Sequence, residues 1–401
     1  MKILIVIPTM HPASGGPPQG IRNFVPELNK LGIICEVLSY DNPEAEYLGK
    51  DNFKIHALGE SKSKWGYNKQ LVSWLSENIQ NYDCLTLHAL WLYQSYAVHK
   101  VIKSLRARKL LNNFKYFIMP HGVLDPYFQE AKERKLKAVR NFIYWKLIEN
   151  RIVNNANGIL FTCEEEMRLA RTTPHSNYHP KKEFNVSYGI TPPPAYNDSF
   201  KIAFNKLINR EEKYSEKPYL LFLGRIRPIK GVDLLIDAYE TILESDLYDS
   251  IPDLVITGPG IDTDFGSNIL HKVKANGKLS GKVHFVGMVS GDSKWGAFYG
   301  CEAFILPSHH ENFGIAVVEA LACSKPVLIS DKINIWKEIK DANAGLVKND
   351  TKEGTLKLLT EWISLTNVRK KEMSEAAFNC YKSYFTNTRT ASALFKIFNE
   401  N

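Results

Sequence analysis

Short apolar runs and amphipathic stretches alternate along the whole chain. A short apolar run that ends in turn residues is typical of a buried strand, and apolar positions that recur every three to four residues are typical of a helix. The two patterns alternate in both halves of the sequence. We therefore predict an α/β protein with parallel sheets.

In the first half we predict strands over residues 3–7, 33–39, 53–58, 83–88, 115–119, 158–163 and 185–188. The run at 3–7 is too short for a signal peptide and no small-residue cleavage site follows it, so a strand is the better interpretation. The Gly- and Pro-rich segment 15–20 is predicted as a loop before a helix that ends near residue 32, and a second helix is expected over 93–111.

The second half repeats the pattern. Strands are predicted over residues 219–223, 254–257, 283–285, 304–306 and 327–330, each followed by a loop and a helical pattern. The Pro-rich segment 189–194 has the composition of a stiff linker between two domains. A last helix is expected over residues 387–401.

A length of 401 residues suffices for two domains, and 44% apolar with 23% charged residues is typical of a globular protein. No apolar run reaches the ~20 residues of a membrane span. The six cysteines are scattered without a metal-binding spacing, and the pair His309 and His310 has no further ligands nearby in sequence. We expect a reducing, cytoplasmic compartment and no structural metal.

The formal net charge of +8 belongs to the first half, because acidic and basic residues are equal in number in residues 191–401. Basic and apolar residues interleave most densely in segment 132–151, which predicts a basic amphipathic helix. It either faces the core with solvated cations, or contacts anionic lipid headgroups or an acidic acceptor. No nucleic-acid recognition motif accompanies the charge, so we expect no nucleic-acid partner.

Two cations lie in the loop that follows the strand at 219–223. The strand ends at Gly224, Arg225 and Lys230 occupy the loop, and a helical pattern begins near Val232. Ligands of open α/β sheets bind at this edge. A guanidinium, an ammonium and loop N–H groups could neutralise a diphosphate without a metal, although ordinary solvated cations are the alternative.

Glu311 and Glu319 are eight residues apart, the first in a loop and the second about two turns into a predicted helix. This spacing places both carboxylates on one side, beside the free N–H groups of a helix N-terminus. Two such groups could hold the hydroxyls of an elongated ligand such as a nucleotide-sugar. Solvated helix charges are the alternative.

Two features of the first half add to this picture. Gly15 and Gly16 do not form the dinucleotide fingerprint, which argues against a nicotinamide cofactor, but glycine permits close approach of the backbone to a phosphate. His121 lies in a Pro–His–Gly corner after the strand at 115–119, where a loop reaches the surface or a cleft.

Together these motifs resemble the retaining GT-B glycosyltransferases of family 4. The resemblance implies two Rossmann-like domains facing a cleft: an acceptor-binding domain over residues 1–190 and a nucleotide-sugar-binding domain over 191–385. A C-terminal helix at 386–401 would pack back on the first domain. No cofactor or metal is implied beyond the donor itself.

The resemblance also implies roles for single residues. Arg225 and Lys230 would hold the donor diphosphate, Glu311 the transferred sugar, and Glu319 the ribose. The other implied contacts are backbone amides of Asn312, Phe313, Gly314 and Ile315 around the sugar and phosphates, Gly16 beside the phosphates, His121 facing the sugar, and, as a weaker match, His88 and Trp91 on the acceptor side. Family members often have glycine where this chain has Asn312, whose side chain could bias the choice of donor.

We therefore predict transfer of a hexose from a nucleoside-diphosphate sugar to a saccharide or lipid-linked acceptor, with retention of configuration. We expect this in the synthesis of cell-surface polysaccharide, exopolysaccharide or glycolipid, in the cytoplasm, with peripheral contact to the anionic inner face of the membrane. Two alternatives stay open: a non-catalytic sugar-nucleotide-binding protein, and another GT-B enzyme such as a sugar-nucleotide epimerase. A phosphorylase would need a pyridoxal-binding lysine segment and a much longer chain. Residues 287–289 are expected to set the base, but they indicate no preference.

Overall fold

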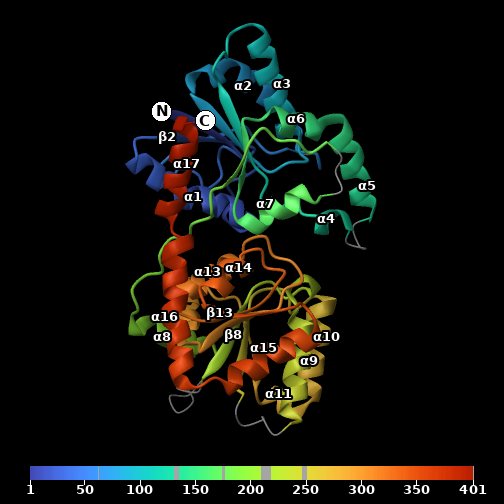
Figure 1. Cartoon of the computed structure of the whole chain (residues 1–401), viewed down its shortest axis with the longest axis vertical. Helices are drawn as coiled ribbons and strands as arrows, with labels where there is room; N and C mark the ends of the chain where they lie inside the picture. Colours follow the sequence, from blue (N-terminus) through green and yellow to red (C-terminus); the bar gives the residue numbers. More distant parts are fainter. Residues whose placement is uncertain (62, 131–134, 174–176, 209–217, 246–250, 401) are drawn as a thin grey trace. The chain divides into compact units, whose positions relative to one another are not determined.

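The computed structural model describes residues 1–61, 63–130, 135–173, 177–208, 218–245 and 251–400. Contacts divide the chain into two compact units (Figure 1). Unit 1 comprises Met1–Gly189 with Asn387–Asn401, and unit 2 comprises Ile190–Thr386. Each unit is an α/β layer structure built on its own parallel sheet.

The sheet of unit 1 has seven parallel strands in the order β3-β2-β1-β4-β5-β6-β7. Their bounds are β1 (Lys2–Val6), β2 (Ile34–Ser39), β3 (Lys54–Ala57), β4 (Cys84–His88), β5 (Lys115–Met119), β6 (Gly158–Phe161) and β7 (Glu183–Asn185). Side chains alternate between the faces of a strand, so Ile3 and Ile5 of β1 enter one apolar core and Leu4 and Val6 enter the other. Both faces of the sheet are therefore covered, as the continuous apolar runs predict.

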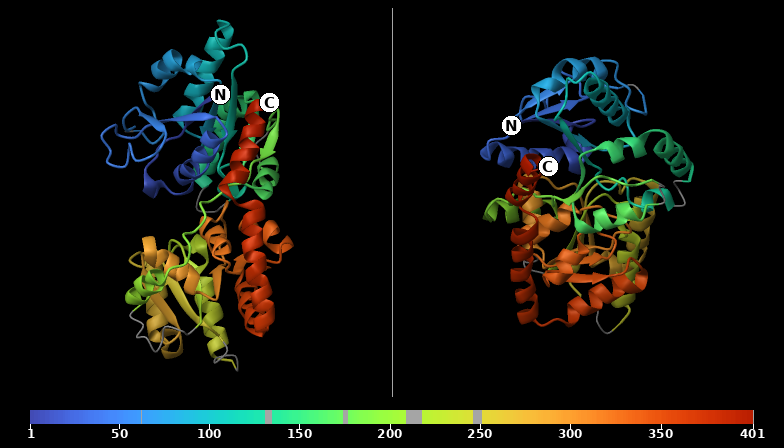
Figure 2. Two further views of the ribbon diagram at one scale, coloured as in Figure 1. Left: turned by 90° about the vertical axis from the view of Figure 1, so that its left-hand side faces the viewer. Right: turned by 45° about the horizontal axis from the view of Figure 1, so that its top comes forward.

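Most helices of unit 1 contribute to one or the other of these two cores. The helices are α1 (Gly16–Lys30), α2 (Leu71–Asn78), α3 (Tyr93–Ala107), α4 (Tyr127–Glu130), α5 (Lys135–Tyr144), α6 (Asn150–Asn155), α7 (Glu164–Arg171) and α17 (Asn387–Glu400), with a π-helical turn at Trp145–Glu149 between α5 and α6. Helices α1 and α17 pack against each other and share one core (Figure 2).

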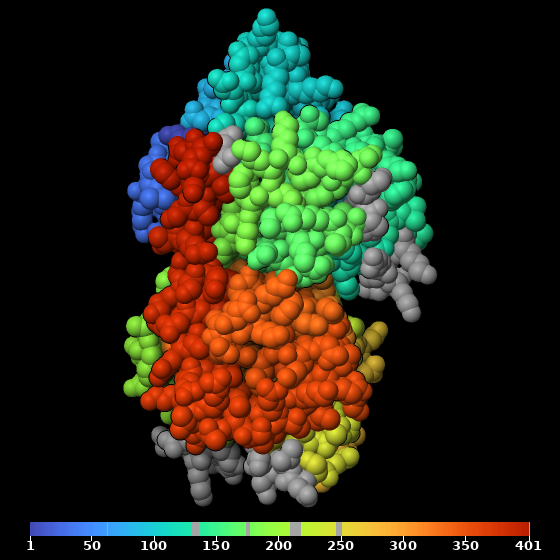
Figure 3. All heavy atoms as spheres, in the orientation of Figure 1, coloured from blue at the N-terminus to red at the C-terminus, as the bar shows by residue number. Residues whose placement is uncertain are grey.

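The predicted return of the C-terminal helix to the first domain is confirmed. The chain leaves unit 2 after Thr386, and α17 then buries Leu394 and Phe398 in unit 1. The rings of Phe398 and Phe117 of β5 lie 5.5 Å apart. In Figure 3 the red α17 runs over the side of unit 1 next to the blue N-terminal segment.

Three predicted boundaries in unit 1 are wrong. The segment 15–20 is a loop only at Gly15, because α1 begins at Gly16 and Pro17 fits the first helical turn, where its missing N–H costs nothing. The strand predicted at 185–188 is β7, which ends at Asn185, and the helix predicted over 93–111 ends at Ala107.

The sheet of unit 2 has six parallel strands in the order β10-β9-β8-β11-β12-β13. Their bounds are β8 (Tyr219–Leu223), β9 (Asp253–Thr257), β10 (Val283–Gly287), β11 (Ala303–Leu306), β12 (Val327–Ser330) and β13 (Gly345–Lys348). The five predicted strands are confirmed. The edge strand β13 was not predicted, since it is short and only Leu346 is buried.

The helices of unit 2 are α8 (Asp198–Leu207), α9 (Val232–Leu243), α10 (Asp264–Ala275), α11 (Gly277–Ser280), α12 (Gly291–Gly300), α13 (Ile315–Ala322), α14 (Trp336–Asp341), α15 (Lys352–Ser364) and α16 (Asn367–Tyr384). The loop at the carboxyl end of β8 carries Arg225 and Lys230, and the loop at the carboxyl end of β11 carries Glu311. Among the described residues of both units, no helix has the length and apolar character to cross a bilayer.

Candidate donor-binding site

The loop after β8 is held against the loop after β9 by backbone hydrogen bonds. Gly224 N donates to Thr257 O (3.0 Å) and Ile226 N donates to Pro259 O (2.8 Å). Gly258 has a φ of 128°, and a Cβ there would lie 2.0 Å from Gly224 O. Glycine at this position therefore allows two loops at the sheet edge to touch.

A second close contact joins the loop after β8 to the end of β11. The 3₁₀ turn η6 (Pro228–Lys230) ends at Gly231, which has a φ of 67° and precedes α9. A Cβ on Gly231 would lie 2.1 Å from Pro307 O, and His309 N donates to Ile229 O (2.8 Å). This approach brings Lys230 beside the loop that carries Glu311.

Lys230 and Glu311, 81 residues apart in sequence, form a direct ion pair. Both side chains are partly buried, with exposed fractions of 15% and 25%. Glu311 N donates to Lys332 O and Asn334 N donates to Glu311 O, both at 3.0 Å, so the backbone of Glu311 is fixed from two sides. The ammonium and the carboxylate predicted to bind a donor thus meet at one place.

Arg225 lies in the same loop and is exposed. Within the part of the chain that the structure describes, no ion pair engages its guanidinium. An Arg without a carboxylate partner presents its planar fork to any incoming anion. Lys230, by contrast, is paired with Glu311, so an anion would have to replace that carboxylate to bind the ammonium.

The residues after Glu311 shape the N-terminus of α13. Asn334 Nδ2 donates to Asn312 Oδ1 (3.3 Å), and Phe313 is buried with its ring 5.7 Å from that of Phe385. Gly314, at φ 78°, precedes Ile315, the first residue of the helix. The first N–H groups of this eight-residue helix lack intrahelical acceptors and suit an anion or sugar oxygens.

Glu319 lies just over one turn into α13, not two, because the helix begins only at Ile315. Its carboxylate pairs with Lys294 of α12, whose Nζ is 2.6 Å from Glu319 Oε1. Burial raises the pKa of Glu319, and the ammonium of Lys294 partly offsets that rise. Lys294 was missed from the sequence, since its separation of 25 residues from Glu319 matches no local pattern.

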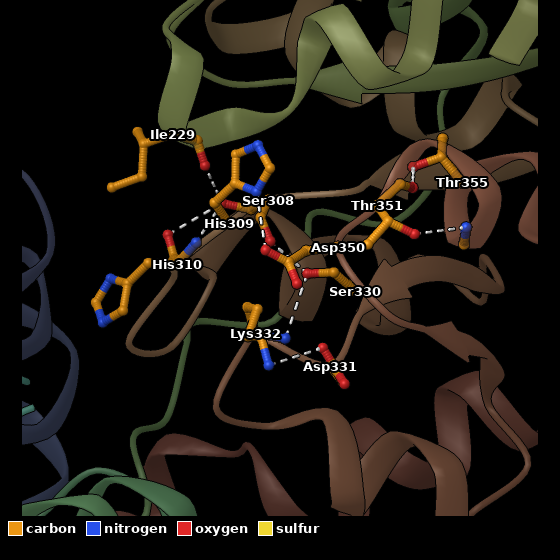
Figure 4. Close-up of polar contacts among 11 residues, drawn as sticks. Ile229, Ser308, His309, His310, Ser330, Asp331, Lys332, Asp350, Thr351 and Thr355 are labelled. Atoms are coloured by element: carbon orange, nitrogen blue, oxygen red, sulfur yellow. Dashed lines mark hydrogen bonds and ion pairs between the residues drawn. The ribbon is translucent and has the colours of Figure 1, made fainter. Parts of the chain in front are cut away.

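A polar network fixes the loops at the carboxyl ends of β11, β12 and β13 (Figure 4). Ser308 Oγ lies 2.8 Å from Ile229 O, and Ser330 Oγ donates to Ser308 O (2.5 Å). His309 Nδ1 lies 2.8 Å from Asp350 Oδ2. These contacts hold the segment that leads into Glu311. In the described ranges no three His, Cys, Asp or Glu side chains gather as a metal site.

In unit 1, His121 follows β5 in a strained corner. Its φ is 54°, and Gly122 N donates to Glu166 Oε1 (2.5 Å). Burial lowers the pKa of His121 to about 3, so its imidazole is neutral at physiological pH. Glu166, on α7, was not predicted as a site residue, although it stabilises the corner that positions His121.

His88, at the end of β4, is 1% exposed and contacts His121. Burial and the neighbouring His121 lower the pKa of His88 well below its ordinary value. Its predicted place on the acceptor side stays a prediction, since the contact seen here is with His121. His88 could affect a bound ligand only indirectly, through its hydrogen bond with the imidazole of His121.

Trp91 lies in the loop between β4 and α3, and Gly16 is the first residue of α1. Trp91 has a φ of 69°, and its N–H donates to Glu149 Oε1 (2.7 Å). Gly16 begins α1, and its carbonyl accepts a hydrogen bond from Tyr188 Oη (2.5 Å). Trp91 follows β4 and Gly16 follows β1 in the chain, and ligands of such sheets bind at the edge where the strands end.

Residues 203–379 match the family described as Glycosyl transferases group 1. An uncharacterised glycosyltransferase of Methanocaldococcus jannaschii is 30% identical over 166 residues, 38% of this chain and 42% of the relative. A D-inositol 3-phosphate glycosyltransferase of Streptomyces bingchenggensis is 29% identical over 129 residues, 32% of this chain and 28% of the relative. The chain thus spans less than half of these relatives.

Two solved structures are similar over the whole chain. Sucrose-phosphate synthase from Thermosynechococcus elongatus has a TM-score of 0.73 at 16% identity, covering 100% of this chain and 98% of that one. Anabaena HepE in complex with UDP and glucose has a TM-score of 0.70 at 16% identity, with 100% of both chains covered. The two parallel-sheet units have the fold of the GT-B glycosyltransferases, and the match to the glycosyl transferases group 1 family lies within unit 2.

Proposed function

We propose that this protein is a retaining glycosyltransferase of family 4 that moves a hexose from a nucleoside-diphosphate sugar to a saccharide or lipid-linked saccharide. The observation that carries the proposal is the ion pair of Lys230 with Glu311 at the carboxyl edge of the second sheet. It joins a diphosphate-binding cation to a sugar-binding carboxylate beside a helix N-terminus.

In this site Lys230 would exchange its partner, Glu311, for the donor when the donor binds. When a diphosphate enters, Lys230 turns from Glu311 to the phosphate oxygens, and Arg225 adds a second charge. The carboxylate of Glu311 is then released to accept hydrogen bonds from the sugar hydroxyls. Donor binding and sugar positioning are thereby coupled through one contact.

Cleavage of the donor leaves negative charge on the diphosphate. Arg225, Lys230 and the first N–H groups of α13 are fixed positive groups for this charge, and such preorganised electrostatics is often the largest part of catalysis. In the front-face scheme of the resembled family, the departing phosphate oxygen takes the acceptor proton. No protein base is then required.

Two further residues have proposed roles in recognition. Glu319, oriented by Lys294, accepts hydrogen bonds from the ribose. The resemblance assigns His121 to the transferred sugar, and a neutral imidazole can donate from one nitrogen and accept at the other. Structures similar to this chain are complexes with UDP and glucose, with UDP-glucose, or with ADP and acarbose, which supports a nucleoside-diphosphate donor. We propose no cofactor and no metal requirement.

Release of nucleoside diphosphate tests the proposal. The purified chain is screened by thermal shift against a panel of nucleoside-diphosphate sugars, and each stabilising sugar is then assayed for slow hydrolysis. We expect one donor class to raise Tm and to release its diphosphate, with loss of release in Lys230→Ala. Stabilisation without any release would favour the non-catalytic sugar-nucleotide-binding protein, and conversion of the sugar to its epimer would favour an epimerase.

We propose cell-surface polysaccharide or glycolipid synthesis, on the cytoplasmic side of the membrane, as the setting of this activity. The surplus of positive charge in the first half of the chain supports an acidic or lipid-linked acceptor. The sugar, the base and the linkage are outcomes of the donor and acceptor screens.

A further inference from the structure

The outer side of α5 and of the π-helical turn that follows it is apolar and open to solvent. Its side chains are exposed by 90% at Leu136, 60% at Val139, 41% at Phe142, 53% at Ile143 and 64% at Leu147. The alternative of a helix that buries its apolar side in the core is therefore wrong for these five positions. Residues 132–134 of the predicted basic segment lie outside the described residues.

The opposite side of the same helix is firmly packed. Asn141 is buried, and Trp145 is fully buried with its ring 6.0 Å from that of Trp91. Figure 1 places α5 at the margin of unit 1. The helix is thus anchored by one side while Leu136, Ile143 and Leu147 recur on the other at helical spacing.

Three exposed cations accompany the apolar side chains: Lys137, Arg140 and Lys146. Residues 135–147 contain no Asp or Glu, and none of the three cations has a carboxylate partner among the residues that the structure describes. Lys146 Nζ lies 4.7 Å from the ring centroid of Phe142. Positive charge and exposed hydrocarbon therefore occur together on one helix.

We propose that this α5 surface (Leu136, Lys137, Val139, Arg140, Phe142, Ile143, Lys146 and Leu147) binds an anionic lipid bilayer. The helix would lie in the plane of the interface, with its aliphatic side chains at the acyl boundary and its cations among the phosphates. Long Lys and Arg side chains can bury their stems and keep their charges at headgroup level. A second copy of the chain is the poorer occupant, because two such surfaces would bring like charges together.

The surface adjoins the segment that the resemblance places on the acceptor side. Trp145, on its packed side, contacts Trp91, and Glu149 of the same π-helical turn accepts the Trp91 N–H. A bilayer bound at α5 would therefore lie close to Trp91. Delivery of a lipid-linked acceptor to this segment rests on the proposed function, whereas lipid binding itself does not.

Flotation with vesicles tests the proposal on the full chain. Vesicles of phosphatidylcholine alone are compared with vesicles that also contain phosphatidylglycerol, at low and high salt. We expect binding to the anionic vesicles that weakens with salt. The triple variant Leu136→Ser, Ile143→Ser, Leu147→Ser should bind at least about tenfold more weakly. The variant Lys137→Gln, Arg140→Gln, Lys146→Gln should lose about fivefold per charge.

A matched control replaces three exposed aliphatic residues elsewhere in unit 1: Leu31, Ile34 and Leu110, each to Ser. This control should bind vesicles like the parent chain. Unchanged binding in both α5 variants would overturn the proposal, as would equal loss in the control. A shift from dimer to monomer in the serine variant, without vesicle binding by the parent, would assign the surface to a second copy instead.

Thermal unfolding and donor hydrolysis without vesicles keep the outcomes separate. Both α5 variants should unfold near the parent temperature, because the altered side chains are exposed, and should release nucleoside diphosphate at the parent rate. Vesicle binding by a chain that releases none would contradict the proposed function and support lipid binding. Diphosphate release with no vesicle binding would support the proposed function and contradict lipid binding.

Discussion

His88 Nδ1 lies 2.9 Å from His121 Nε2, so two imidazoles from the ends of neighbouring strands share a hydrogen bond. Burial lowers the pKa of both rings, and neither is charged at physiological pH. One ring must donate and the other accept. The tautomer of His121, and hence the group it offers to a ligand, is therefore coupled to His88.

The corner that holds His121 depends on Glu166. Its carboxylate accepts hydrogen bonds from Gly122 N (2.5 Å), Thr162 N (2.7 Å) and Thr162 Oγ1 (2.6 Å). Glu166→Ala leaves these donors unpaired and should lower the free energy of unfolding by about 2–5 kcal/mol. Denaturant titration measures this. The exposed Glu164→Ala on the same helix is the control, and an equal loss in both variants would contradict the role of Glu166.

Removal of either member of the Lys230–Glu311 pair should slow turnover strongly without unfolding unit 2. Lys230→Ala and Glu311→Ala should each lower kcat by about 100- to 1,000-fold, because each removes a fixed charge from the reacting groups. Steady-state kinetics with the donor found by screening gives the rates. Arg227→Ala removes an exposed cation from the same loop and should change kcat little. Near-parent rates in Lys230→Ala would argue against the assigned site.

Lys294 should act through Glu319. Lys294→Met leaves the buried carboxylate of Glu319 without its cation, which should raise the KM for the donor and cost about 1–3 kcal/mol of stability. Adding Glu319→Gln should recover most of the stability, because no buried charge is left unpaired, but should not recover KM. A double-mutant cycle with additive stability losses would show that the two residues act independently.

Glu149 should make stability fall as pH rises. Burial raises its pKa from 4.5 to about 7, although hydrogen bonds from Ser95 and Trp91 oppose the rise. The folded state therefore prefers the neutral acid. The contribution of Glu149 to the free energy of unfolding is fully present below pH 4.5. It is lost as pH rises through about 7, and the total loss is up to about 3 kcal/mol.

Glu149→Gln, a neutral isostere, should flatten this dependence. The measurement is the free energy of unfolding of parent and variant between pH 5 and pH 8. We expect the parent to lose stability over this range relative to the variant. Parallel curves for the two proteins would contradict the raised pKa of Glu149.

Gly231 should not tolerate a side chain. Gly231→Ala places a Cβ 2.1 Å from Pro307 O at a φ of 67°, so the loop that carries Lys230 must move away from β11. We expect a loss of about 2–4 kcal/mol together with reduced kcat. Gly277→Ala, where a Cβ meets nothing within 4 Å, is the matched control and should be neutral. A stable, active Gly231→Ala would show that the close contact is dispensable.

Local patterns in the sequence were enough to predict the alternation of strands and helices and the position of the candidate loops. Apolar runs, glycines and prolines determine the local structure of the backbone around them. Pattern alone could therefore locate β8, which precedes Arg225 and Lys230, and β11, which precedes Glu311. The first turn of α1 was missed because two prolines look like a loop, although they also fit a helix start.

Which of these residues contact one another is set by how the elements pack together. The pairing of Lys230 with Glu311 depends on Gly231 touching Pro307, and that of Glu319 with Lys294 depends on the Lys294 side chain of α12 reaching α13. The exposure of Leu136 on α5 likewise depends on which side of the helix Trp145 anchors. The two ion pairs join residues that are far apart in sequence, and the exposure of Leu136 depends on which side of α5 packs against the rest of unit 1. No local sequence pattern encodes such contacts.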